Sequence, residues 1–209
     1  MKIKHFAFTL AEVLITLGII GVVATMTMPT LIANHQKKET VTKLKAFNSI
    51  MGQAFQMAKA ENGDWDTWDS GDFGSGLSDS GDGKKQLEWL QKYILPYVKT
   101  TEVTTKGKYA IVGLANGSGF TNYNSLYFFC LKFKDCKQTT ETWNSRDRFV
   151  FQFNTQKGFG PLSDNLTFNT RDDIINSTSK WHACNKNRTG FCAKLIEYDG
   201  WEIKKDYPW

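Results

Sequence analysis

The chain begins with a long apolar segment. After a short basic start, the residues from Val13 to Ala33 are predominantly apolar, and Glu12 is the only ionisable side chain between His5 and His35. A run of about 20 apolar residues is long enough to cross a bilayer as a helix. A carboxylate costs roughly 2.5–3.5 kcal/mol at the centre of a membrane, so the position of Glu12 needs an explanation.

The apolar segment leads into an amphipathic one. From Gln36 to Ala60 apolar residues recur every three or four positions, which is typical of a helix with one buried face. A helix from Phe8 to Glu61 would span about 80 Å at 1.5 Å per residue. Pro29 lacks an N–H and crowds the preceding turn, so we expect a kink there, or alternatively a break into two helices. The apolar positions of the second half are Val41, Leu44, Phe47, Met51, Ala54, Phe55 and Ala58.

Beyond residue 61 the pattern changes twice. Residues 62–83 are rich in Asp and Gly and predict a long loop, and residues 84–95 predict a short amphipathic helix. The rest of the chain has strand-like segments and no regular alternation of strands and helices. The pattern therefore predicts an α+β fold, in which a long N-terminal helix packs on an antiparallel β-sheet head over residues 84–209. The expected strands are 109–114, 126–133, 148–153 and a hairpin of 193–198 with 201–204, joined by Asp199-Gly200.

The charges suggest an orientation in the membrane. Lys2 and Lys4 precede the apolar run and no acid lies among the first seven residues, which favours a cytoplasmic N-terminus and an extracytoplasmic head. Lys37 and Lys38, on the far side, oppose this preference. The net charge of +5 is spread along the chain rather than clustered, so nucleic acid is not an expected partner. The simplest interpretation is an uncleaved signal anchor that tolerates Glu12 near the interface.

A second interpretation rests on a motif at the start of the apolar run. The segment Ala7-Phe8-Thr9-Leu10-Ala11-Glu12 resembles the processing site of type IV prepilins and type II secretion pseudopilins. The resemblance implies that a prepilin peptidase cuts between Ala7 and Phe8 and then methylates the α-amine of Phe8. Family members usually have Gly where this chain has Ala7. Pro29 falls at the family's spacing for a helix-bending proline.

The resemblance also implies a role for Glu12. Cleavage creates a positive α-amine on Phe8, and a carboxylate one helical turn away can pair with it in the same or a neighbouring subunit. In the family this pairing is held to align an incoming subunit with the growing filament. The chain would then comprise a leader (1–7), a transmembrane segment (8–33), its amphipathic continuation (34–61), the loop (62–83) and the head.

The implied partners and location follow from the same resemblance. The protein would be a single-pass protein of a bacterial inner membrane, in contact with the lipid bilayer, the prepilin peptidase and an inner-membrane assembly platform. It would then join other pilin or pseudopilin subunits in a homo- or hetero-filament, at the cell surface or in the periplasm. The resemblance does not separate a type IV pilus from a type II secretion pseudopilus.

The four cysteines all follow residue 129, in the region expected outside the cytoplasm. Their spacings do not match zinc ribbons, and His182 is the only imidazole nearby. Disulfides are therefore predicted, as is usual in an oxidising compartment. Three connectivities are open; Cys130–Cys136 with Cys184–Cys192 is favoured because short loops close readily. The alternative is four reduced, buried thiols.

The Asp-rich loop is the one candidate metal site. Clustered carboxylates can hold Ca²⁺, and some pseudopilins bind this ion, but the spacing does not fit an EF-hand loop. A solvated loop is the favoured interpretation, and no other cofactor is predicted. Trp65 and Trp68 suggest that the loop docks on the head. The weak Ca²⁺ candidates are Asp64, Asp66, Asp69, Asp72, Asp79 and Asp82.

No catalytic motif is found in the sequence. It has no nucleophile elbow, phosphate-binding glycine loop or zinc-protease helix, so no catalytic residue and no enzymatic activity are predicted. The predicted function is that of a structural filament subunit. The alternative is a membrane-anchored binding head, as in an adhesive or DNA-uptake minor pilin, because exposed members of the seven tryptophans could stack on a glycan or DNA.

Overall fold

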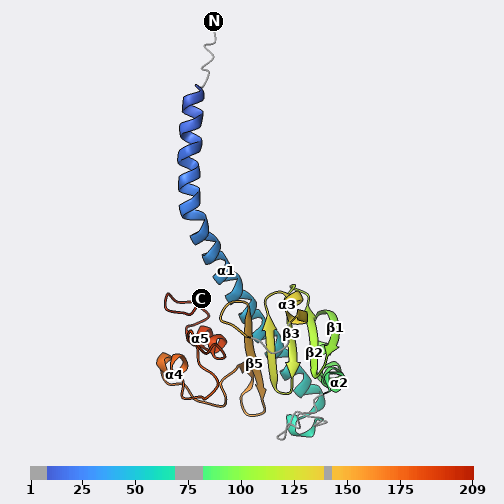
Figure 1. Ribbon diagram of the computed structural model, residues 1–209. Helices are drawn as coiled ribbons and strands as arrows, with labels where there is room; N and C mark the ends of the chain where they lie inside the picture. Colours follow the sequence, from blue (N-terminus) through green and yellow to red (C-terminus); the bar gives the residue numbers. More distant parts are fainter. Residues whose placement is uncertain (1–8, 69–81, 139–142) are drawn as a thin grey trace. The chain divides into compact units, whose positions relative to one another are not determined.

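The structure is a computed structural model of the chain and describes residues 9–68, 82–138 and 143–209 (Figure 1). It forms two compact units, residues 1–39 and 40–209, which we describe separately. Helix α1 (Leu10–Asn62) begins in the first unit and ends in the second. Pro29 lies inside this helix, so the alternative of two helices separated at the proline is not what the structure shows.

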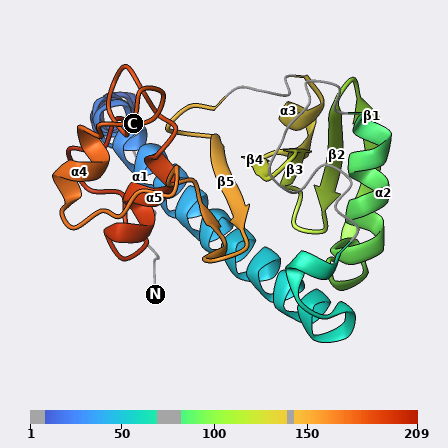
Figure 2. The same cartoon turned by 90° about the horizontal axis from the view of Figure 1, so that it is seen from below.

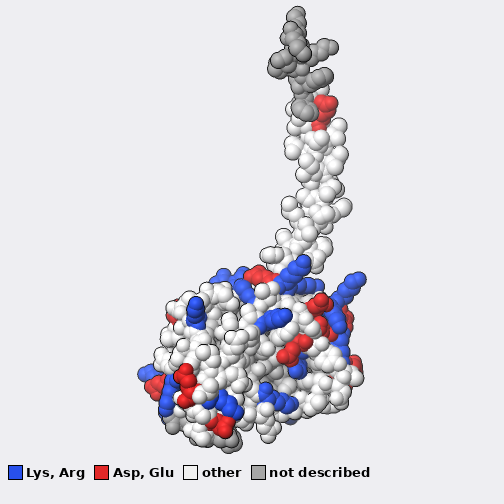
Figure 3. All heavy atoms as spheres, turned by 180° about the vertical axis from the view of Figure 1, so that it is seen from behind, with Lys and Arg blue, Asp and Glu red and all other residues white. Residues whose placement is uncertain are grey.

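In the first unit the structure describes residues 9–39, which include the apolar part of α1. By length and composition α1 is able to cross a membrane, and its apolar window has no buried residue in the structure. No charged residue lies between Glu12 and His35, whereas basic and acidic side chains are mixed over the head (Figure 3). Three threonine hydroxyls of this part donate to backbone carbonyls of the same helix, as suits an apolar environment. Thr16, Thr25 and Thr27 donate to the carbonyls of Val13, Val22 and Val23 at 2.9, 2.8 and 3.0 Å.

The second unit is built on one antiparallel sheet. Its six strands pair in sequence order, so each strand lies beside the next along the chain. Figures 1 and 2 show α2 at the β1 and β2 end of this sheet and α4 and α5 at the β5 end. The predicted α+β fold, a long apolar N-terminal helix with an antiparallel sheet, is confirmed. The strands are β1 (Thr100–Lys106), β2 (Tyr109–Leu114), β3 (Gly119–Tyr123), β4 (Leu126–Cys130), β5 (Arg148–Asn154) and β6 (Gly158–Pro161).

The second half of α1 provides one side of the head's core. Phe47 stacks on Phe129 of β4, with ring centroids 4.5 Å apart, and Phe55 stacks on Phe153 of β5 at 4.1 Å. Both helix phenylalanines are fully buried. The amphipathic face predicted for this half is confirmed, because six of its seven apolar positions are buried and Val41 packs at the edge of the core. The six are Leu44, Phe47, Met51, Ala54, Phe55 and Ala58.

Two tryptophans pack the segment after α1 against the head. Trp68 is buried and stacks on Tyr93, at 4.7 Å between centroids, and Trp65 packs against Phe55 and Phe153. The predicted docking of this part of the loop is therefore confirmed. The elements that follow α1 are the 3₁₀ turn η1 (Trp65–Thr67), helix α2 (Gly83–Tyr93) and the 3₁₀ turn η2 (Leu95–Tyr97).

The predicted hairpin near the C-terminus is wrong. Residues Cys192–Tyr198 form helix α5, which buries Leu195 and Ile196. Asp199-Gly200 ends this helix rather than joining two strands: Gly200 has φ +76°, and the N–H groups of Gly200 and Trp201 donate to the carbonyls of Glu197 and Ile196. These two bonds form a Schellman motif, which uses the same left-handed glycine as a hairpin turn.

Residues 131–133, predicted as the end of a strand, leave the sheet instead. The chain turns after Cys130 into the short helix α3 (Phe133–Gln138). The ring of Phe133 lies against Gly113 and Gly119, where an added Cβ would come within 3.0 and 2.6 Å of it. The two glycines on β2 and β3 thus leave the space into which Phe133 turns.

The four cysteines form two disulfides, Cys130–Cys136 and Cys184–Cys192, which is the pairing favoured by the short loops. The first ties the end of β4 to α3, and the second ties the preceding loop to the first residue of α5. The structure has no free cysteine.

Replacing Cys184 and Cys192 together by serine should lower the free energy of unfolding by about 2–3 kcal/mol, because the unfolded chain loses a closed loop. Chemical denaturation of the oxidised proteins measures the difference. The matched control is Asn187→Ser, an exposed position inside the same loop, which should change stability by less than about 0.5 kcal/mol. Thiol titration of the denatured wild type before reduction should detect no free thiol; a titratable thiol would contradict this pairing.

Candidate functional site

The predicted cleavage residues Ala7 and Phe8 lie outside the described residues, which begin at Thr9. Glu12 is described and has defined partners. Its Oε2 accepts hydrogen bonds from the backbone N and from Oγ1 of Thr9, each at 2.8 Å. The backbone N of Glu12 donates in return to Thr9 Oγ1 at 3.2 Å. This reciprocal arrangement is a capping box at the first turn of α1.

The capping box assigns a structural role to Glu12 that was missed in the sequence. The signal was readable, because Thr9-Leu10-Ala11-Glu12 has the Ser/Thr-x-x-Glu spacing of such a box. A carboxylate at this end of a helix also interacts favourably with the helix dipole. Thr9 and Glu12 thus fix the point at which α1 begins.

The other residues of the predicted assembly site belong to different parts of the molecule. Pro29 lies in the apolar part of α1, within the first unit. The two disulfides belong to the second unit, where each staples a short local loop. Glu12 and Pro29 therefore act on the helix, whereas the cysteines act on the stability of the head.

Two of the six weak Ca²⁺ candidates have other partners. Asp64 pairs with Lys59 at 2.7 Å, and Asp82 caps α2 by accepting from the backbone N of Lys84 at 2.9 Å. The other four candidates cannot be placed in this way. Asp69, Asp72 and Asp79 lie outside the described residues, and so does the side chain of Asp66. Within residues 9–68, 82–138 and 143–209, no three His, Cys, Asp or Glu side chains are grouped to hold a metal ion.

His182 takes part in a polar cluster in the head. Its Nδ1 lies 2.7 Å from Oδ2 of Asp164, and the Ser179 hydroxyl donates to the same oxygen at 2.7 Å. In a nucleophilic dyad the hydroxyl would bond to the imidazole, whereas here both groups bond to the carboxylate. The cluster joins the loop after β6 to the loop before α5, and we assign it a bracing role.

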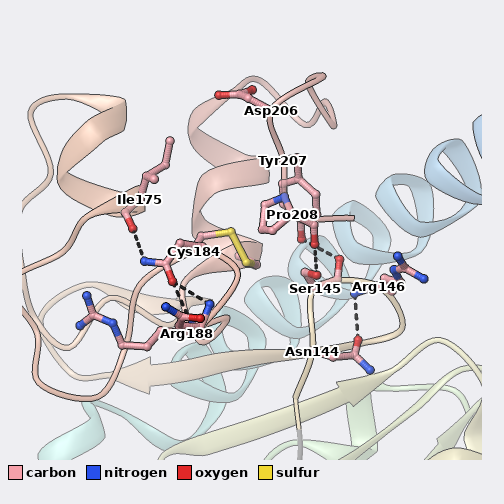
Figure 4. Close-up of a disulfide and its surroundings, with 12 residues drawn as sticks. Asn144, Ser145, Arg146, Ile175, Cys184, Arg188, Asp206, Tyr207 and Pro208 are labelled. Carbon is pink, nitrogen blue, oxygen red and sulfur yellow. Dashed lines mark hydrogen bonds between the residues drawn. A yellow bond between two sulfur atoms is a disulfide. The ribbon is translucent and has the colours of Figure 1, made fainter.

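The C-terminal segment is tied to the head by ionic and polar contacts. Arg171, at the start of α4 (Arg171–Ile175), donates to both carboxylate oxygens of the buried Asp199 at 2.9 Å and also binds Asp206. The bond from Arg171 lowers the pKa of the Asp206 carboxyl below its ordinary value. The Tyr207 hydroxyl donates to the carbonyl of Ser145 at 2.8 Å (Figure 4). These contacts hold the last residues against the start of α4 and the loop before β5.

A mostly apolar cavity of about 280 Å³ lies beside the part of α1 that belongs to the head. Ile50 and Met57 line it from the helix, and Val98 and Leu114 line it from the sheet side. Met57 is 51% exposed and Ile50 37%, which is unusual for apolar side chains next to a well-packed core. This part of α1 therefore also presents apolar surface beside the face that packs on the sheet.

These observations define a class. A long apolar N-terminal helix, continued by an amphipathic half that packs on an antiparallel sheet, is a pilin-like architecture. The chain belongs to the family described as "Family of unknown function (DUF6613)", whose model matches residues 30–209. Searches among curated proteins and among solved structures give no match.

Proposed function

We propose that the protein is a structural subunit of a pilin-like filament, either a type IV pilus or a type II secretion pseudopilus. It is held in the inner membrane as a single-pass precursor, and its prepilin-type motif is processed between Ala7 and Phe8. The observation that carries the proposal is the apolar part of α1, which is unburied in the structure and continues without interruption into the core of the head.

The same apolar surface needs two different environments in this proposal. Lipid covers it while the protein is anchored, with an extracytoplasmic head whose two disulfides suit an oxidising compartment. Once the subunit is extracted, only other apolar surface can cover it, and copies of the same helix supply that surface in a filament. The exposed side chains of Ile50 and Met57 provide further apolar surface on the head itself.

No catalytic step is part of the proposal. The partners are the prepilin peptidase, the inner-membrane assembly platform and neighbouring subunits. Glu12 pairs with the α-amine that cleavage creates on Phe8, in its own or a neighbouring subunit, and so joins processing to assembly. Pro29 bends or loosens the helix at its position.

Mass spectrometry of the protein purified from its host tests the proposal. We expect the mature chain to begin with N-methylated Phe8, because the motif directs the cut after Ala7. In a host that lacks its prepilin peptidase, the chain should keep its first seven residues. A variant Ala7→Arg, which places a large charged residue before the cut, should also remain uncleaved. An unprocessed N-terminus in the wild-type host would overturn the proposal.

The alternative of a binding head receives support from one residue only. All seven tryptophans fall within the described ranges, and only Trp181 is exposed; Trp68 and Trp89 are buried and the other four are half-buried. A coplanar set of exposed tryptophans, which would favour stacking on a polymer, is therefore not formed by these residues.

A further inference from the structure

The indole of Trp181 stands out on the surface of the second unit. It is 69% exposed, more than any other large apolar side chain described in residues 40–209. An indole is the largest apolar side chain, so leaving it in water forgoes a large burial energy. Tryptophan is also the residue type most enriched among binding anchors.

The backbone that carries Trp181 is braced by Ser179. The Ser179 hydroxyl accepts hydrogen bonds from the N–H groups of Trp181 and His182, at 3.3 and 3.2 Å, and donates to Asp164. His182 binds the same carboxylate. A Cβ at Gly190 would lie 2.4 Å from the His182 ring, so the glycine lets the two parts of the loop approach closely.

Arg188, which Figure 4 shows near Cys184, also braces this loop. The Arg188 guanidinium donates to the carbonyls of Ser177 and Ser179, and the Cys184–Cys192 disulfide closes the loop behind it. The indole thus projects from a backbone that these contacts hold. A side chain presented in this way loses little conformational entropy on binding, which is the advantage of a preorganised site.

The charge beside the indole indicates the kind of ligand. Nζ of Lys180 lies 4.7 Å from the centre of the Trp181 ring, so a cation accompanies the aromatic surface. The neighbouring exposed positions of the loop are polar: Thr178, Lys186 and Asn187. A ligand that fits these groups has one apolar face, several hydroxyl groups and a negative charge. A sugar ring that bears a carboxylate has all three.

We propose that Lys180 and Trp181 form a binding site for an acidic saccharide. The apolar face of the sugar packs on the indole, its carboxylate binds the Lys180 ammonium, and its hydroxyls meet the polar side chains of the loop. Single-stranded nucleic acid is the less suitable ligand, since it uses successive stacking platforms along a basic groove. Among the described tryptophans only Trp181 is exposed, so a series of stacking platforms is not formed by these residues. The site does not depend on whether the chain assembles into a filament.

A glycan array probed with the full chain in detergent micelles tests the site. The array carries uronate- and sialate-containing oligosaccharides, their neutral methyl esters, and oligo-dT. We expect retention on acidic saccharides, at least tenfold weaker retention on the esters, and no comparable retention on oligo-dT. Trp181→Ala and Lys180→Gln should each weaken retention at least tenfold, while Trp181→Phe, which keeps an aromatic face, should stay within a few fold of wild type.

Met57→Ala is the matched control, because it removes an exposed apolar side chain elsewhere on the head and should not change retention. The melting temperature of Trp181→Ala should equal that of the wild type, since the ring is exposed. The proposal is overturned by retention on no saccharide, by equal retention on acids and esters, by retention on oligo-dT alone, or by full retention of the Trp181→Ala variant.

Discussion

Replacing Glu12 with glutamine should leave the protein folded and inserted in the membrane but remove it from filaments. Glutamine can occupy the last position of a capping box, so the contact with Thr9 and the start of α1 should persist. The variant loses only the negative charge, which in the proposed assembly step pairs with the α-amine of processed Phe8. A hydrogen bond to a charged group contributes about 1.5–3 kcal/mol, so each subunit addition should weaken by roughly 10- to 100-fold.

Comparison with Thr9→Ala separates the two roles of the carboxylate. That variant removes the capping hydroxyl and should cost about 1 kcal/mol of helix stability, yet it keeps the charge and should still assemble. Immunoblots of the membrane and sheared-filament fractions from the host measure both effects. Normal incorporation of Glu12→Gln, or an equal loss of assembly in Thr9→Ala, would show that capping rather than charge explains why Glu12 is present.

Truncating Phe47 to alanine should lower the free energy of unfolding of the head by about 3–5 kcal/mol, the usual cost of removing a buried phenylalanine. The ring is fully buried and lies within 5.6 Å, centroid to centroid, of four other phenylalanine rings. The cavity left behind would lie between the helix and the sheet. These rings belong to Phe120, Phe129, Phe151 and Phe159.

Guanidinium unfolding of the full chain in micelles, followed by near-ultraviolet circular dichroism, measures this loss. Lys45→Ala is the matched control, because Lys45 is exposed on the same stretch of α1 and its truncation should cost less than about 0.5 kcal/mol. A loss below 1 kcal/mol for Phe47→Ala would mean that α1 contributes little to the stability of the head.

The elements with regular hydrophobic periodicity were predictable from the sequence. Helix α1 and strands β2, β4 and β5 have runs of apolar or aromatic side chains that tertiary packing then buries. β1 was missed because its residues are mostly Thr, Lys and Glu and largely solvent-accessible, so no alternation marks it. β6 has four residues, two of them glycine, and is recognisable only through its pairing with β5.

The features missed near the candidate sites have other physical causes. Asp199-Gly200 is ambiguous, since a left-handed glycine ends a helix as readily as it turns a hairpin; the disulfide at Cys192 and the burial of Leu195 and Ile196 decide for the helix. The exposure of Trp181 depends on contacts between segments distant in sequence, such as that of His182 with Asp164. The hydrophobic and polar pattern of one segment does not reveal contacts between distant segments.

The strand order has a consequence for how copies of the head can meet. A meander of six strands has two open edges, β1 and β6, and an open edge can pair with the edge of another molecule. Here β6 is four residues long and ends in Pro161, which has no N–H to donate, while β1 carries charged side chains and its Glu102 pairs with Lys137. Both edges resist the addition of a strand, so heads held close together at high local concentration should remain separate β-sheets.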